Sequence, residues 1–89
     1  MNYSEMLDFE INVQVAEVTG KHADYCNSWA DAGPIIEANK ITISAPMEYD
    51  QPADWLSYPA SDSDTCISWP KPLRAAMTCF LVMQEKRNA

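Results

Sequence analysis

Residues 72–87, PLRAAMTCFLVMQEKR, decide the fold. Pro72 suits the first position of a helix, where a backbone N–H is not needed. From Leu73 to Arg87 there is no Gly or Pro, and nine of the eleven residues from Leu73 to Met83 are apolar. A helix that is apolar nearly all round is buried on more than one side. We predict a central C-terminal helix, enclosed by its own chain or by a second copy. Its large apolar circumference favours the homodimer.

A second helix is predicted from Asn27 to Asn39. Ser28 and Asp31 have the spacing of a capping box, in which the Ser side chain accepts a hydrogen bond from the first turn. Pro34 lies inside the segment and removes one backbone hydrogen bond, which predicts a kink. Asn39 suits a left-handed residue at the exit of the helix.

The segment from Asp8 to Val18 allows two interpretations. Apolar and polar residues alternate from Phe9 to Val15, which is the period of a strand and slightly favours one. As a helix, the segment would begin with Asp8 as its N-cap and stop at Gly20. The pattern alone leaves both interpretations open.

Three short segments predict strands. Ile41 to Ser44 alternates and is β-branched, Trp55 to Tyr58 follows a loop rich in proline and acids, and Thr65 to Ser68 follows a polar turn. Short connections between them predict an antiparallel meander. The fold class is therefore α+β: two or three helices packed on a small antiparallel sheet of two to three strands. At 89 residues the chain makes one domain, residues 1–89.

The charge of the chain is −7, and no Lys or Arg lies between Ile41 and Pro70. Nucleic acids are bound by clustered Lys and Arg, so direct binding is not expected. The acidity either keeps the protein dissolved or attracts a basic protein partner, to which the surface could mimic a nucleic acid. Trp55 is expected to be the most exposed of the three Trp residues, because acids and prolines surround it. The predicted partner-binding residues are Glu48, Asp50, Asp54, Trp55, Asp62 and Asp64.

The sequence predicts a cytoplasmic location. The three cysteines, Cys26, Cys66 and Cys79, form no disulfide framework. Residues 1–10 lack the positive and apolar regions of a signal peptide. The longest apolar run spans nine residues, whereas a membrane helix needs about twenty. No membrane association is expected.

No catalytic, cofactor or metal site is predicted. Cys26 and Cys66 with His22 and Asp24 lack the paired spacings of a zinc site, and Asp62 and Asp64 lack the rest of a calcium loop. These groups are better explained as small apolar thiols and a solvated turn. Cys26 or Ser28 as a nucleophile has only His22 nearby as a base. With two glycines in the chain, a phosphate-binding Gly-rich loop is excluded.

Three blocks of sequence, in order, carry a family resemblance. They are YSEMLDFEIN at 3–12, CNSWADAGPII at 26–36, and PLRAAM at 72–77 followed by Phe80-Leu81 and Met83-Gln84-Glu85. The chain resembles the NinX-like proteins of lambdoid bacteriophages. It departs from them in the short stretch from Gly20 to Tyr25, and in Lys71, where the resemblance expects Asn.

The resemblance implies a fold in which helices cover a short antiparallel sheet, and it favours a helix over Asp8 to Val18. It implies a phage protein in the cytoplasm of an infected bacterium, and it supplies no activity and no catalytic residues. We therefore expect a non-enzymatic phage accessory protein that binds a protein partner. The alternative is an accessory factor in phage nucleic-acid metabolism or recombination.

Overall fold

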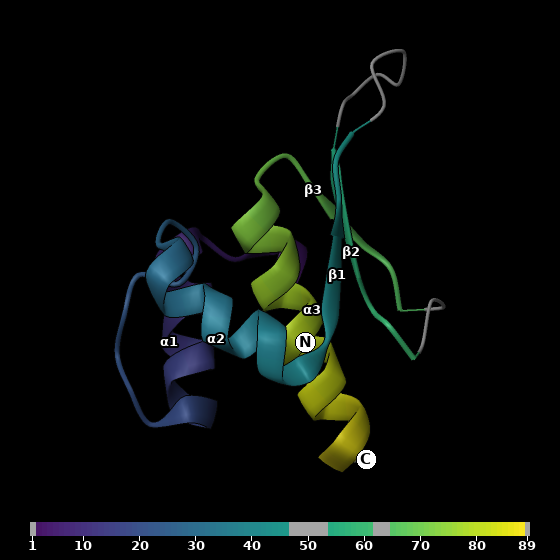
Figure 1. The fold of residues 1–89 in the computed structure, drawn as a ribbon. Helices are drawn as coiled ribbons and strands as arrows, with labels where there is room; N and C mark the ends of the chain where they lie inside the picture. Colours follow the sequence, from purple (N-terminus) through teal and green to yellow (C-terminus); the bar gives the residue numbers. More distant parts are fainter. Residues whose placement is uncertain (1, 47–53, 62–64, 89) are drawn as a thin grey trace.

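The computed structural model describes residues 2–46, 54–61 and 65–88, which form three α-helices, one short 3-10 helix and three strands. In chain order these are η1 (Tyr3–Glu5), α1 (Asp8–Thr19), α2 (Trp29–Asn39), β1 (Ile41–Ser44), β2 (Trp55–Pro59), β3 (Ile67–Trp69) and α3 (Pro72–Asn88). The strands form one antiparallel sheet in the order β1-β2-β3. The helices lie on one side of this sheet (Figure 1). The predicted α+β class is confirmed.

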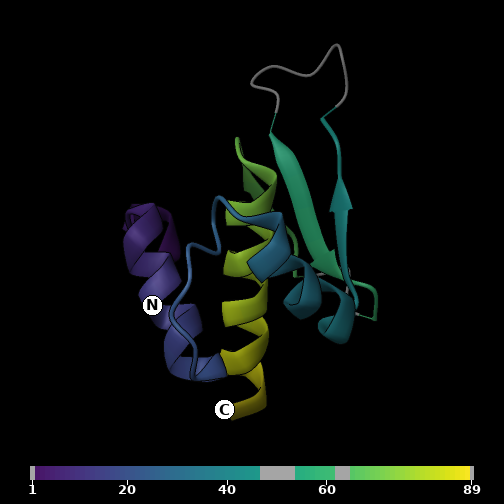
Figure 2. The same cartoon turned by 60° about the vertical axis from the view of Figure 1, so that its left-hand side comes forward.

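Helix α3 is central, as the sequence predicts. It contacts all three strands, α1 and α2 (Figure 2). Nine consecutive residues from Leu73 to Leu81 are buried. Nine residues make two and a half helical turns, so every side of this part of α3 is covered. The other elements of the same chain bury the apolar surface of α3. The large apolar circumference of this helix is therefore no longer an argument for a homodimer. The homodimer itself stays a prediction.

The segment from Asp8 is a helix, so the strand that its alternation favoured is wrong. Ile11 and Val15 are fully buried, whereas Phe9 and Val13 are 63% and 42% exposed. The alternation therefore combines two pairs spaced by four residues, on two different sides of one helix. The N-cap is Leu7 rather than Asp8, and the Glu10 carboxylate accepts a hydrogen bond from the Leu7 N–H at 3.0 Å. Gly20 ends the helix at a φ of 81°, as expected.

Helix α2 begins as predicted and ends one residue differently. The Ser28 hydroxyl accepts a hydrogen bond from the Asp31 N–H at 3.3 Å, as a capping residue does. The left-handed residue at the exit is Lys40, at a φ of 53°, and not Asn39. Asn39 is the last helical residue, and its side-chain amide donates to the Ile35 carbonyl at 2.8 Å.

The sheet register determines which residues face α3. Ser57 pairs with Ile43 on one side and with Ile67 on the other, and these three residues share the inner face. The third strand is shifted from the predicted Thr65–Ser68 to Ile67–Trp69, so that Trp69 pairs with Trp55. The opposite face includes Leu56 and Ser68, both exposed. Within residues 2–46, 54–61 and 65–88, no helix is long and apolar enough to cross a membrane.

The burial of α3 yields a stability prediction. Phe80 is 4% exposed in the core cluster. Truncating a buried Phe costs about 3–5 kcal/mol, and a domain this small has only about 5–10 kcal/mol in total. We expect Phe80→Ala to be marginally folded or unfolded in thermal melts followed by circular dichroism.

The matched control is Glu37→Ala, at an exposed position of α2. This change should alter the free energy of unfolding by no more than about 0.5 kcal/mol. Glu85 does not serve as a silent control, because its carboxylate accepts a hydrogen bond from the Tyr3 hydroxyl at 2.6 Å. A Phe80→Ala protein melting within a few degrees of the parent would contradict the core assignment.

Candidate functional site

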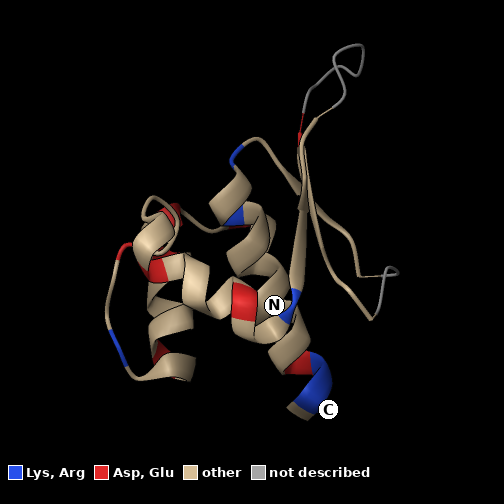
Figure 3. Ribbon diagram, viewed as in Figure 1, with Lys and Arg blue, Asp and Glu red and all other residues tan. Residues whose placement is uncertain are grey.

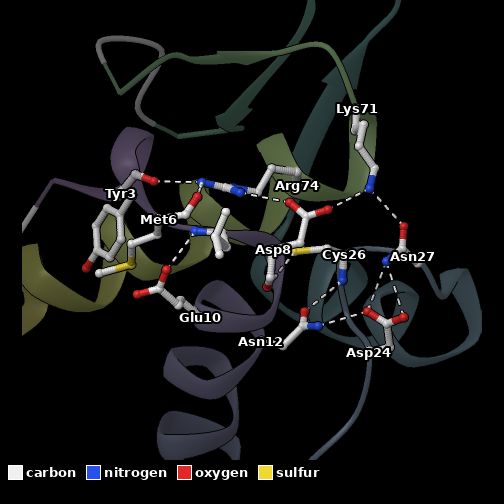
Figure 4. Close-up of polar contacts among 11 residues, drawn as sticks. Tyr3, Met6, Asp8, Glu10, Asn12, Asp24, Cys26, Asn27, Lys71 and Arg74 are labelled. Atoms are coloured by element: carbon white, nitrogen blue, oxygen red, sulfur yellow. Dashed lines mark hydrogen bonds and ion pairs between the residues drawn. The ribbon is translucent and has the colours of Figure 1, made fainter.

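A buried arginine organises the polar contacts of the molecule. Arg74 lies on the first turn of α3 and is 1% exposed. One guanidinium nitrogen donates to the Asp8 carboxylate at 2.8 Å, and the other donates to the carbonyls of Tyr3 and Met6 at 2.7 and 2.8 Å (Figure 4). The guanidinium also lies over the ring of Trp69, with 4.3 Å between its carbon and the ring centroid. Arg74 thus holds the N-terminal segment against both α3 and the sheet.

Asp8 is the acid of this arrangement and binds two cations. Its second carboxylate oxygen accepts a hydrogen bond from the Lys71 ammonium at 2.6 Å, and Lys71 also donates to Asn27 at 2.8 Å. Burial acts to raise the pKa of Asp8, but the hydrogen bonds from Lys71 and Arg74 outweigh it and hold the pKa below its usual value. Asp8 is therefore ionised at neutral pH. Lys71, where the resemblance expects Asn, supplies a second cation here.

The same cluster continues into the connection between α1 and α2. The Asn12 side chain accepts from the Cys26 N–H at 3.0 Å and donates to Asp24 at 2.8 Å. Asn27 also donates to Asp24, at 3.1 Å. These bonds fix the connection onto α1 without regular secondary structure (Figure 4).

Cys26 is held as a neutral thiol. It is 1% exposed, and its sulfur lies 3.6 Å from the Asp8 carbonyl oxygen. Burial, followed by the negative charge of Asp8, raises the pKa of the thiol to about 12. The thiolate is the reactive form of cysteine, so Cys26 is inert at neutral pH. Ser28, the other nucleophile considered from the sequence, is engaged in capping α2.

The network joins the three blocks that carried the family resemblance. Tyr3 and Asp8 come from the first block, Cys26 and Asn27 from the second, and Arg74 from the third. In the sequence, Arg74 is one of the two residues from Leu73 to Met83 that are not apolar. This basic residue in an apolar helix was the signal that could have predicted the network, because a buried positive charge needs an acid nearby.

The residues predicted to bind a partner are only partly visible. Trp55 is half-buried on the inner face of the sheet, and Asp54 directly precedes it. Trp29, at 57%, is the most exposed Trp, so the expectation for Trp55 is wrong. Trp29 is the first residue of α2. The other predicted residues lie outside the described residues: Glu48, Asp50, Asp62 and Asp64.

The described acids and bases lie in the helices and connections rather than in the strands. The three strands contain no charged residue, and the bases lie in the helices or beside them (Figure 3). Among the described residues, no three His, Cys, Asp or Glu side chains come together as a metal site. His22 and Cys66, considered as zinc ligands, are both exposed.

The network yields a second stability prediction. Asp8→Asn removes the carboxylate that balances the buried Arg74 charge. Removing one partner of a buried ion pair typically destabilises by about 3–5 kcal/mol. We expect a loss toward the lower end in urea unfolding at pH 7, because the Asp8 side chain is 31% exposed. Glu17→Gln, which neutralises an exposed acid on the same helix, is the control and should be almost silent.

The lowered pKa of Asp8 predicts how this loss depends on pH. The folded state holds the carboxylate ionised more strongly than the unfolded state does, so its stabilising effect is fully present above the unfolded pKa, about 3.9. The effect disappears as the pH falls through the lower, folded pKa. The difference in stability between the parent and Asp8→Asn should therefore narrow below about pH 4. A constant difference from pH 7 to pH 2 would argue against the ion pair.

Comparison with known proteins identifies the family. The family described as "Bacteriophage P22, NinX" matches residues 23–84, which is 62 of the 89 residues. No curated protein and no solved structure matches the chain. The match includes the second block and all of the third except Glu85, with Cys26, Asn27, Lys71 and Arg74 of the polar network. The first block lies before it, and the network connects that block to the matched part. The chain belongs to the NinX family of bacteriophage proteins.

Proposed function

We propose that this chain is a non-enzymatic phage accessory protein, active in the cytoplasm of the infected bacterium, that binds a basic protein partner through the side of the molecule formed by the sheet. The observation that carries this proposal is a long stretch of sequence without Lys or Arg. The strands are uncharged, and residues 41–70 contain five acids and no base. Complementary charge steers association and excludes partners of the same sign.

The bases are unsuited to bind a phosphate backbone. Lys71 and Arg74 both contact Asp8, Lys21 lies 3.9 Å from Asp31, and Lys86 donates to the Thr65 hydroxyl. Nucleic-acid binding needs cations gathered on one exposed face. Four of the six bases are thus engaged within the chain, which supports a protein partner over direct binding to DNA or RNA.

The sheet offers a face for such a partner. Helix α3 covers the inner face, and no described element packs on the opposite face (Figure 1). That face combines apolar and hydroxyl side chains: Thr42, Ser44, Leu56, Tyr58 and Ser68. Because β2 is antiparallel to both neighbours, the two acid-containing connections leave from its opposite ends.

The chemistry of the polar cluster also argues for a binding protein. Its carboxylate is held by two cations, and its thiol is protonated and buried. A catalytic nucleophile needs an accessible, activated group with a base beside it. The cluster stabilises the fold and offers no such group.

The proposal is tested by capturing partners of the tagged full-length chain from infected cells and identifying them by mass spectrometry. Asp54→Lys reverses a charge beside β2, and Glu17→Lys makes the same reversal on the helical side. We expect a basic partner whose affinity falls about tenfold or more with Asp54→Lys, and little with Glu17→Lys. Equal effects of the two variants, or no captured protein, would contradict the proposal.

The alternative, mimicry of a nucleic-acid surface in phage recombination or nucleic-acid metabolism, gives a distinct result. The partner would then be a nucleic-acid-binding protein, and DNA or RNA would compete with this chain for it. In fluorescence anisotropy at about physiological salt, the chain itself should bind labelled single- and double-stranded DNA no better than micromolar. Tighter, salt-sensitive binding would show that the chain binds nucleic acid directly.

A further inference from the structure

A groove runs along the free edge of β3. The strand order β1-β2-β3 leaves β3 at the edge of the sheet, with β2 on its other side. The groove has a volume of about 260 Å³ and lies between β3, helix α3 and the N-terminal segment. Its floor includes Thr78 and Val82 of α3, and its far wall includes Tyr3 and Ser4.

The groove follows the backbone of the edge strand. Four consecutive residues, 66–69, line it. Successive side chains of a strand point to opposite faces, so a cavity beneath the sheet would contact only every second residue. The lining includes Ser68 of one face of β3 together with Ile67 and Trp69 of the other, which places the groove beside the strand. Alternate residues of an antiparallel edge strand also direct their N–H and C=O groups away from the sheet, where another strand can pair with them.

We propose that this groove binds an extended, basic segment of the partner protein, which pairs with β3 as a fourth strand and inserts apolar side chains against Ile67, Trp69 and Val82. Strand addition of this kind takes its affinity from main-chain hydrogen bonds and its specificity from pockets for alternate side chains. The volume is below the range of about 300–1,000 Å³ for small-molecule sites and suits one or two side chains of a peptide. The inference rests on the proposed function and specifies its binding mode.

Charge determines which occupant fits. The edge belongs to the base-free stretch from Ile41 to Pro70, and the whole chain carries a charge of −7. A second copy of the chain would bring the same negative charge to the same edge, and like charges repel. A segment in which Lys or Arg alternates with Val or Ile complements both the charge and the apolar lining. The three residues of β3 include no Lys or Arg.

Cys66 makes the groove accessible to experiment. It lines the groove and is exposed, whereas Cys26 and Cys79 are 1% and 0% exposed. A bulky maleimide should therefore react with Cys66 alone and obstruct the edge without disturbing the core. The control is a Cys66→Ser, Glu37→Cys double variant, which carries the same label on the exposed side of α2.

The experiment selects binders to the immobilised full-length chain from a library of random seven-residue peptides and measures their affinity by calorimetry. We expect peptides with alternating apolar and basic residues. The label on Cys66 should weaken their binding at least tenfold, and the label on residue 37 should not. In NMR spectra of the folded chain, the amides of residues 66–69 and the Val82 methyl groups should shift, while those of α1 should stay.

Other results overturn the proposal. Failure to select any peptide does so, as does selection of acidic peptides, unchanged affinity after Cys66 labelling, or shifts confined to α1 or the outer face of the sheet. A mass of two chains in light scattering that the Cys66 label reduces to one would show that a second copy occupies the edge. If the captured partner responds to Asp54→Lys but still binds the chain labelled at Cys66, the proposed function stands and strand addition is wrong.

Discussion

The fold depends on the pairing of the buried Arg74 guanidinium with Asp8. A charge this deep in a small domain is strongly destabilising unless it is paired and hydrogen-bonded. Here the carboxylate, two main-chain carbonyls and the face of Trp69 surround it, although the Nε atom has no hydrogen-bond partner among the described residues. If the N-terminal segment detached, α3 would be exposed and the Arg74 guanidinium would lose its hydrogen-bond partners Asp8, Tyr3 and Met6. One pair therefore links the first residues of the chain to its last helix.

Features that depend on residues close together in the sequence were predictable, and features that depend on tertiary contacts were not. The C-terminal helix, the cap at Ser28 and the strand at Ile41 depend on neighbouring residues, and they were predictable. The segment at Asp8 was ambiguous because its apolar residues fit both periods, and only tertiary packing selects the buried pair of Ile11 and Val15. The third strand was misplaced for the same reason, since pairing with β2 determines its register.

The polar network could not be predicted from patterns among neighbouring residues. Asp8 lies 63 and 66 residues before the two cations that it binds, and no spacing rule connects positions so far apart. The family resemblance marked the participating blocks without explaining them. The structure explains Arg74 as the partner of Asp8, and Lys71 as a second cation rather than a failed helix cap. Several residues of the blocks that carry the family resemblance therefore stabilise the fold. They do not by themselves mark a functional site.

The sheet side of the molecule is the surface to which the proposed function assigns the partner. An uncovered edge strand usually invites pairing with other copies, and proteins commonly protect such edges with Lys, Pro or a covering segment. In this chain β3 carries no charge, and Pro70 comes only after it ends. Among the described residues no strand pairs with the outer edge of β3, and the charge of −7 on every copy opposes pairing between two copies. Repulsion of this kind acts on acidic chains alone and leaves the edge open to basic ones. In the proposed binding mode, the charge that opposes pairing between copies also favours a basic partner, and the uncharged strands provide the surface on which that partner binds.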